Sequence, residues 1–240
     1  FTERGSGPQV TAHEAYDENE EAQYVLDTIA TLTASNKIRP GDCAVMYRTN
    51  AQSRVLEDAF VRANLPYKLV GAQRFYGRRE IKDLLAYLRL IHNPADSVSA
   101  ARVLNVPPRG IGAKTQEALA AAAEQTGLGW GEILLDLAEH GKRSLLADRF
   151  PGRAGTPLTA FGGLLAGWAA AREQESVLGL MDRVLGEVDF DGYLNDGTDE
   201  GRDRWENVQE LRRVAAAFAN IALAEFLTEL ALVSDQDTLT

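Results

Sequence analysis

The hydrophobic pattern of this 240-residue chain changes at Gly71. Before Gly71, short apolar stretches that favour extended backbone alternate with stretches of helical period. These five stretches are residues 9–16, 17–32, 43–47, 51–63 and 67–70. A short continuous apolar run such as residues 43–47 is typical of a parallel strand that is covered on both faces. We therefore predict an α/β layer of order βαβαβ, with parallel strands, for residues 1–70.

After Gly71 the apolar residues recur only with the 3.6-residue period of helices. The helical stretches are residues 81–88, 115–124, 130–137, 158–172, 177–185 and 205–218. Because a domain has about 150 residues on average, the length of the chain suits one large domain or two small ones. We predict an all-α second domain over residues 71–240, in a chain that is mainly α overall.

The net charge of −10, from 25 basic and 35 acidic residues, argues by itself against a nucleic-acid partner. The charge is unevenly distributed, however. Residues 1–67 hold 6 basic and 10 acidic side chains, residues 68–114 hold 9 and 3, and residues 115–240 hold 10 and 22. Residues 68–114 therefore form a basic island, and a nucleic-acid surface is predicted there.

A Gly-Ile-Gly turn lies near the end of this basic island and precedes a predicted helix. Glycine has no Cβ, so the backbone can approach a phosphate closely, and the free N–H groups of a first helical turn point toward an anion. The candidate phosphate contacts are Arg109, Gly110, Ile111, Gly112, Lys114 and Thr115. The alternative is a plain connection between two helices, in which the glycines only cap and turn the chain.

Two further groups of polar residues are candidate contacts. The cations before the turn are expected on the exposed side of one helix, and they are Arg74, Arg78, Arg79, Lys82 and Arg89. Residues 47–54 follow a predicted parallel strand, at the edge where open α/β sheets place ligands. Arg48 and Asn50 lie in this segment. The simpler alternatives are a solvated basic face and, for Asn50, an N-cap.

Enzymatic motifs are absent from the sequence. It contains no GxxxxGK[ST], GxGxxG, HExxH, CxxC or GxSxG pattern, and its three histidines have no spacing typical of metal ligands. We therefore predict no catalytic residue and no metal site. The single cysteine, Cys43, is typical of a reducing compartment, so we expect a cytoplasmic protein. No apolar run approaches the roughly 20 residues that cross a bilayer, and no membrane partner is expected.

The stretch MYRTNAQSRVLEDAFVRANLPYKLVGAQRFYGRREIKDLLAYLRLIHNP, followed by NVPPRGIG, resembles the superfamily 1 DNA helicases of the UvrD/PcrA family. The resemblance is densest over residues 42–116, and ENVQEL and AEFLTELALVSD continue it toward the C-terminus. It implies that residues 1–70 are the first half of a RecA-like domain, 2A, and that residues 71–240 are a helical domain inserted in it, 2B. The chain departs from the family after Asn220, where an acidic loop is usual.

The resemblance also implies the activity of a parent enzyme, which is ATP-driven 3′ to 5′ translocation on single-stranded DNA with duplex unwinding, in repair or replication. ATP and Mg²⁺ would be its cofactors. The segment itself has no Walker motif, so we expect it to bind neither cofactor and to hydrolyse nothing.

The resemblance implies two DNA partners. Domain 2A would bind single-stranded DNA, and domain 2B would bind duplex DNA. Arg48 and Asn50 match positions on the single-strand track. The positions that match those facing the duplex backbone are Lys82, Gly110, Ile111, Gly112 and Thr115. Arg109 and Lys114 are added because of their charge.

Two alternatives remain from the sequence. The helical part could be a protein-interaction or autoinhibitory module, whose acidic residues 115–240 bind a repair protein. An isolated helix–hairpin–helix module of a nuclease or ligase is the other, which the preceding βαβαβ pattern disfavours.

Overall fold

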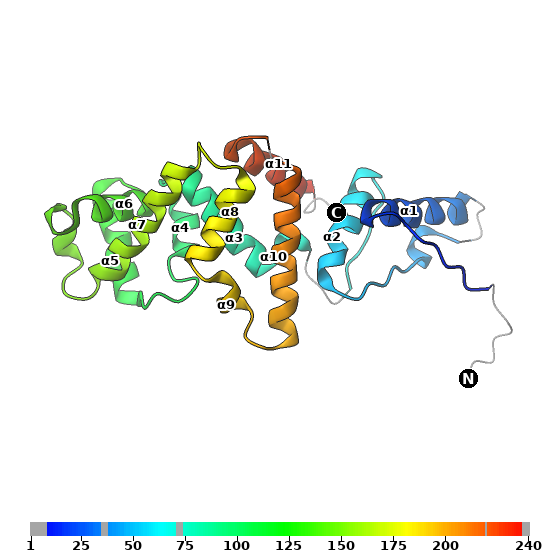
Figure 1. Cartoon of the computed structure of the whole chain (residues 1–240), viewed down its shortest axis with the longest axis horizontal. Helices are drawn as coiled ribbons and strands as arrows, with labels where there is room; N and C mark the ends of the chain where they lie inside the picture. The colour runs from blue at the N-terminus through cyan, green and yellow to red at the C-terminus, as the bar shows by residue number, and fades with distance from the viewer. Residues whose placement is uncertain (1–8, 35–37, 71–73, 219, 237–240) are drawn as a thin grey trace. The chain divides into compact units, whose positions relative to one another are not determined.

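The computed structural model describes residues 9–34, 38–70, 74–218 and 220–236. The chain divides into two compact units, Phe1–Val70 and Gly71–Thr240, which are called unit 1 and unit 2 here (Figure 1). Each unit has its own cluster of buried apolar side chains, and each is described by itself.

Unit 1 is built around two α-helices, α1 (Glu18–Ala34) and α2 (Ser53–Arg62), with the short 3-10 turns η1 (Pro40–Asp42) and η2 (Asn50–Gln52) between them. The two α-helices bury a small apolar core made of Ala22, Leu26, Ile29, Val55, Ala59 and Phe60. The acids at the start of α1 favour the helix because they face the positive end of its dipole.

The predicted βαβαβ layer is wrong, because the residues described in unit 1 contain no β-strand. Residues 9–15, 43–47 and 66–69 have no regular structure. An extended segment becomes a strand only when its N–H and C=O groups pair with those of a neighbouring strand, and no such ladder is formed between these segments. Met46 is 95% exposed, so the cover on both faces expected for residues 43–47 is also missing, and Val10 in the first predicted strand is 100% exposed.

Unit 2 is all-α over its described residues. Its elements are η3 (Phe75–Gly77), α3 (Arg79–His92), α4 (Ser97–Val103), α5 (Ala113–Thr126), α6 (Trp130–His140), η4 (Gly141–Arg143), η5 (Ala147–Arg149), α7 (Gly155–Ala171), α8 (Val177–Glu187), α9 (Phe190–Leu194), α10 (Asp199–Ala217) and α11 (Leu223–Gln236). Within the described ranges, no helix is both long enough and apolar enough to cross a bilayer.

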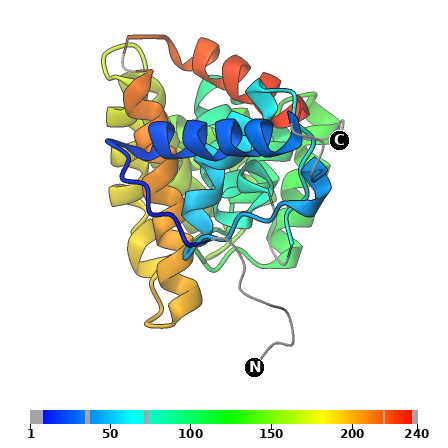
Figure 2. The ribbon, with the colours of Figure 1, turned by 90° about the vertical axis from the view of Figure 1, so that its right-hand side faces the viewer.

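Helix α3 is the centre of unit 2. Ten of its residues are buried, and it contacts α4, α7, α8, α10 and α11. Figures 1 and 2 show α10 (orange) running alongside α8 (yellow), and the two helices are in contact. On the other side of the unit, α6 and α7 approach closely because residue 162 is a glycine. A Cβ at Gly162 would lie 2.0 Å from the carbonyl oxygen of Leu134.

A buried network of hydrogen bonds joins the start of α3 to α10. Arg78 Nη1 donates to Asn207 Oδ1 at 2.6 Å, and Asn207 Nδ2 donates to Glu80 Oε1 at 2.6 Å. All three side chains are buried, and buried polar groups are costly unless they are hydrogen-bonded in this way. The expectation that Arg78 lies on the exposed side of its helix is therefore wrong.

Candidate nucleic-acid interface

The predicted phosphate-binding turn lies in a hairpin, residues 104–112, that connects α4 to α5. The Ile111 side chain is 1% exposed and belongs to the core of unit 2, whereas Gly110 and Gly112 on either side of it are exposed. Ile111 thus anchors the hairpin, and the two glycines present bare backbone to solvent.

The conformation of the hairpin depends on one asparagine and one glycine. Asn105 Oδ1 accepts hydrogen bonds from the N–H groups of Arg109 at 2.7 Å and Ile111 at 3.3 Å. Gly110 has φ +73°, in the left-handed region that favours glycine. Sequence reasoning missed Asn105, although the tendency of asparagine side chains to bond nearby backbone could have indicated it.

Arg109 is turned toward the hairpin's own backbone. Its Nη1 donates to the carbonyl oxygens of Val103, Leu104, Val106 and Pro107 at 2.8, 3.2, 3.2 and 3.2 Å. Its Nη2 donates to the Tyr87 hydroxyl, and its Cζ lies 4.4 Å from the centroid of the Phe161 ring. The guanidinium therefore satisfies carbonyls at the end of α4, which a helix leaves without partners, and it lies against an aromatic face.

Tyr87 supports the same hairpin from α3. Its hydroxyl donates to the carbonyl oxygen of Val106 while accepting from Arg109. Burial is the main cause that raises the pKa of Tyr87 to about 12. The hydroxyl consequently keeps its proton at neutral pH and remains a donor to the hairpin.

The first turn of α5 is open to an approaching anion. Gly112 occupies the N-cap position and provides no side chain to cap the helix. Among the described residues, no hydrogen bond engages the N–H groups of Gly112, Ala113 or Lys114. A Cβ at Gly110 or Gly112 would meet nothing within 4 Å. This combination of free N–H groups and open space is what phosphate binding at a helix N-terminus requires.

The charge at this helix end differs from that at the starts of α1 and α10. Helices α1 and α10 have acids in their first turns, whereas the first turn of α5 has none. Instead it has Lys114, which is exposed, and Thr115, which is half-buried. A cation near the positive end of a helix dipole is unfavourable without a counter-charge, so this end of α5 favours an anion.

Lys82 is exposed on α3 and lies apart from the hairpin. It is five residues from Tyr87, which places the two side chains about 140° apart around the helix. Arg79, Lys82, Arg89 and His92 are the exposed residues of α3. Arg79 lies 3.8 Å from Asp83, while Lys82 and Arg89 are in no ion pair within the described ranges. The structure therefore joins residues 109–115 in one site and leaves Lys82 on another side of α3.

Arg48 and Asn50 lie in unit 1, just before α2. Arg48 is exposed, and the N–H groups of Arg48 and Thr49 donate to Gln52 Oε1 at 2.9 and 3.1 Å. Asn50 is half-buried and is the first residue of η2, whose N-cap position is taken by Thr49. The alternative interpretation of Asn50 as an N-cap is therefore not what the structure shows. Gln52, which organises this turn, was not predicted.

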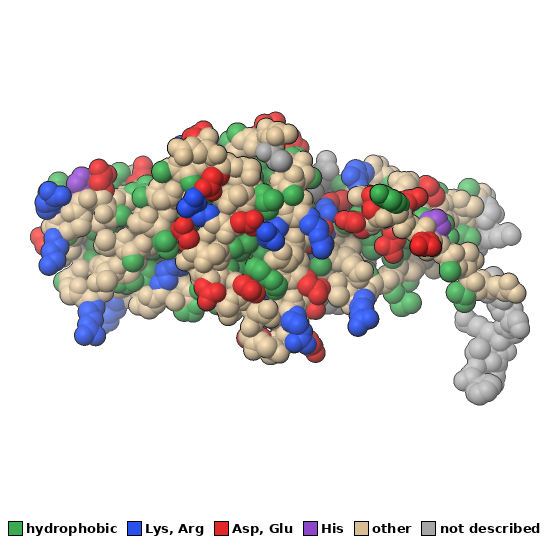
Figure 3. Space-filling model, viewed as in Figure 1, with side chains coloured by type: hydrophobic (Ala, Val, Ile, Leu, Met, Phe, Trp, Pro, Cys, Tyr) green, Lys and Arg blue, Asp and Glu red, His purple; other side chains and the backbone are tan. Residues whose placement is uncertain are grey.

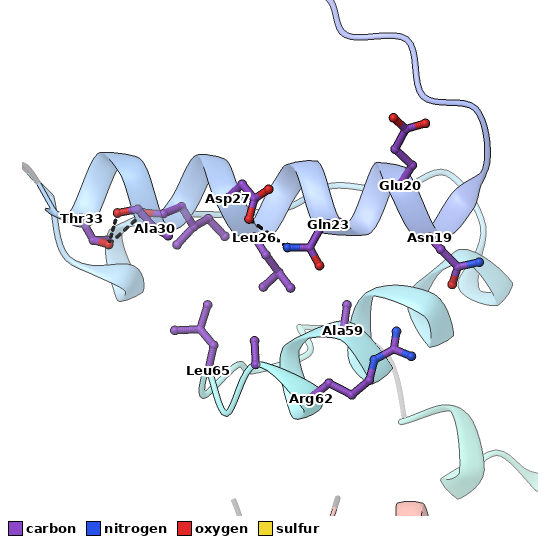
Figure 4. Close-up of a pocket in the computed structure, with 12 residues that line it drawn as sticks. Asn19, Glu20, Gln23, Leu26, Asp27, Ala30, Thr33, Ala59, Arg62 and Leu65 are labelled. Carbon is purple, nitrogen blue, oxygen red and sulfur yellow. Dashed lines mark hydrogen bonds between the residues drawn. The ribbon is translucent and has the colours of Figure 1, made fainter.

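A groove of about 920 Å³ lies between α1 and α2 in unit 1 (Figure 4). Its lining includes Glu20 and Asp27, and Arg62 is its one basic residue. This lining does not fit a nucleotide phosphate, which needs donors and positive charge. No cluster of His, Cys, Asp or Glu able to hold a metal ion occurs in the described part of the chain. The lining of this groove therefore does not fit ATP.

Comparison with known proteins gives consistent matches. Residues 1–150 match the family model of the UvrD-like helicase C-terminal domain. The chain is 36% identical, over 99% of its length, to the ATP-dependent DNA helicase UvrD1 of Mycobacterium tuberculosis strain H37Rv. It is 34% identical, over 100% of its length, to the ATP-dependent DNA helicase PcrA of Bacillus subtilis strain 168. In both cases it covers 32% of the relative, so it spans about a third of the length of these relatives.

Proposed function

Because the chain belongs to the UvrD-like helicase family, we propose that it is a segment of an ATP-dependent 3′ to 5′ DNA helicase, in which unit 2 grips duplex DNA and regulates unwinding. Unit 1 then corresponds to part of domain 2A, and unit 2 corresponds to domain 2B. ATP and Mg²⁺ bind to other parts of the parent. The observation that supports the duplex grip best is the open, positively charged first turn of α5.

The grip follows from the chemistry of the hairpin. The N–H groups of residues 112–114 donate to one phosphate, while Lys114 neutralises its charge and the Thr115 hydroxyl adds a donor. Gly110 and Gly112 let the phosphate come close, because no Cβ stands in its way. Contacts of this kind position a protein on a duplex without reading its sequence. Arg109 contributes by holding the hairpin through its carbonyl contacts.

The remaining candidates complete the proposed DNA path. Lys82 contacts a phosphate of the duplex from the exposed side of α3. Arg48 and Asn50 contact the single strand from unit 1. These assignments are supported by the exposure of Lys82 and Arg48 and by the match of residues 1–150 to the family.

Duplex binding by chain 1–240 tests the proposal. Fluorescence anisotropy with a short labelled duplex should show an affinity that falls as salt rises from about 50 to 200 mM. The double variant Gly110→Ala with Thr115→Ala should bind about tenfold more weakly, equal to about 1.4 kcal/mol. Gly163→Ala with Thr159→Ala is the matched control, since both residues lie in α7 and Gly163 has open space around it.

Two outcomes would contradict the duplex grip. One is equal loss of affinity in the variant and its control, and the other is salt-insensitive capture of a repair protein with no binding of DNA. In the complete enzyme, the hairpin variant should lose unwinding while single-strand-stimulated ATP hydrolysis survives. Equal loss of both activities there would also count against the assignment.

A further inference from the structure

A second group of cations lies in the segment between α6 and α7, residues 141–154, called the connector here. It has four basic residues, Lys142, Arg143, Arg149 and Arg153, and one acid, Asp148. Residues 115–240 hold 10 basic and 22 acidic residues in total. The connector is therefore a basic stretch within the acidic part of the chain.

The connector cations are not neutralised by carboxylates of their own unit. All four are exposed, and none of them is in an ion pair within the described ranges. The arginines of α8 and α10, by contrast, are ion-paired: Arg183, Arg202, Arg204, Arg212 and Arg213. Figure 3 shows this mixing of Lys and Arg with Asp and Glu side chains over α8 and α10. The connector charge thus stays available to an external anion.

Buried side chains and hydrogen bonds fix the conformation of the connector. Leu146 and Phe150 are buried in the core of unit 2. The Ser144 hydroxyl donates to the Asp136 carboxylate and accepts from the N–H of Leu146 at 3.0 Å. Between these anchors, Leu145 is 97% exposed. Four cations and one apolar side chain are therefore exposed on a segment that its buried residues fix to the core of unit 2.

Helix α5 links the connector to the hairpin. Arg149 Nη1 donates to Gln125 Oε1 at 2.5 Å, near the C-terminal end of α5, while the hairpin precedes its N-terminal end. A helix of this length spans about 20 Å, which is less than the roughly 34 Å of one turn of B-DNA. Glu117 and Glu124 are exposed on α5 between the two ends and would repel phosphates. Two separate contacts on one duplex fit this arrangement better than one continuous contact.

We propose that the connector is a second duplex-DNA contact, in which its cations bind phosphates and Leu145 packs against the sugars beside them. This inference rests on the proposed function, because the hairpin holds the same duplex. It adds a second site, which lies about the length of α5 away from the hairpin. An acidic protein segment is the competing partner for such a surface, and the link through α5 to the hairpin favours the sugar–phosphate backbone.

Charge-matched variants of chain 1–240 test the second contact. The connector variant combines Lys142→Gln, Arg143→Gln and Arg153→Gln, and it leaves Arg149 in place because of its bond to Gln125. The control combines Arg183→Gln, Arg202→Gln and Arg204→Gln, which removes the same charge from paired positions. The salt dependence of duplex binding should lose about 2.7 units of slope in the connector variant, at about 0.9 per phosphate contact. The control slope should stay close to that of the unaltered chain.

The outcomes separate the two proposals. An unchanged slope in the connector variant, with weak binding by the hairpin variant, would overturn the second contact and leave the proposed function standing. Equal loss of slope in both triple variants would also overturn it, because long-range charge would then explain the effect. If the unaltered chain binds no duplex, the proposed function itself fails.

A crosslinking experiment gives a second readout that does not depend on removing charge. A benzophenone label on Leu145→Cys, in a Cys43→Ser background, should crosslink to the duplex under ultraviolet light. A label on Leu232→Cys, at another exposed leucine, is the control and should not. Crosslinking to a poly-glutamate peptide in preference to the duplex would overturn the proposal in favour of an acidic protein partner.

Discussion

The cations of unit 2 fall into two groups that composition alone does not distinguish. In α8 and α10, arginines such as Arg204 and Arg212 lie against carboxylates on the same or the neighbouring helix. At the hairpin and in the connector, Lys114, Lys142 and Arg143 have no carboxylate partner within the described ranges. Paired surface charges produce little net field and little stability. Pairing with carboxylates, more than the number of cations, therefore indicates where this chain can bind an anion.

Arg109 belongs to neither group, and replacing it should have the largest effect on stability. Arg109→Met removes five hydrogen bonds and leaves the carbonyls of the hairpin without their donor. We expect the free energy of unfolding to fall by about 3 kcal/mol. Arg202→Met, which breaks an exposed ion pair, should cost less than about 0.5 kcal/mol. Urea denaturation of both variants measures the difference, and similar losses would show that the Arg109 contacts do not support the hairpin.

Replacing Gly110 should have the next largest effect on stability. Gly110→Ala forces a residue with a Cβ into φ +73°, which costs about 1–2 kcal/mol. Gly163→Ala, in the interior of α7 with open space around it, should instead stabilise the chain by about 0.5–1 kcal/mol. Thermal unfolding reports both values. A Gly110→Ala chain as stable as the unaltered chain would mean that the hairpin adopts another conformation.

Replacing Tyr87 should have a smaller effect on stability, and this effect should depend on pH. Tyr87→Phe removes the hydrogen bond that the hydroxyl donates to Val106 and the one it accepts from Arg109, and it should cost about 1 kcal/mol at neutral pH. The pKa of Tyr87 is about 12 in the folded chain and about 10 when unfolded. The unfolded state therefore loses its proton first, and the unaltered chain loses stability between about pH 10 and 12. In the variant this loss should shrink, and identical alkaline profiles would contradict the burial of the hydroxyl.

Replacing Lys82 should have the smallest effect, and it concerns the salt dependence of duplex binding. Lys82→Gln removes one proposed phosphate contact and should lower the salt slope of duplex binding by about 0.9. Arg204→Gln removes the same charge from an ion-paired position and should change the slope much less. Anisotropy titrations of the two variants compare them directly. A larger change for Arg204→Gln would reverse the distinction between paired and unpaired cations.

Helical periodicity predicted most of unit 2, and its errors have local causes. The stretch 177–185 corresponds to α8, which covers Val177–Glu187. Helix α10 begins at Asp199, although the pattern placed its start at Trp205, because its first turns are polar. Thr198 caps this start by accepting from the N–H of Gly201 at 2.9 Å, and the acids that follow suit a helix N-terminus. The polar residues that precede Trp205, from Asp199 onward, are therefore the beginning of the helix.

The errors in unit 1 and in the site arise from partners distant in the sequence. An apolar run such as residues 43–47 favours extended backbone, but a strand also requires a neighbour for its ladder. The position of the hairpin was predicted from its glycines, whereas the direction of Arg109 depends on Tyr87 and Phe161, which lie on other helices. The connector charge was not predicted, because four cations are few against the 22 acidic side chains of residues 115–240.

Amide NMR of isotope-labelled chain 1–240, titrated with a short duplex, tests the duplex grip most directly. The amide resonances of Gly112, Ala113 and Lys114 should shift on binding, because their N–H groups donate to a phosphate. Those of Asp199 and Glu200 should remain in place, since these acids already neutralise the first turn of α10. Saturable binding with no shift at the hairpin, or with larger shifts at α10, would contradict the assignment.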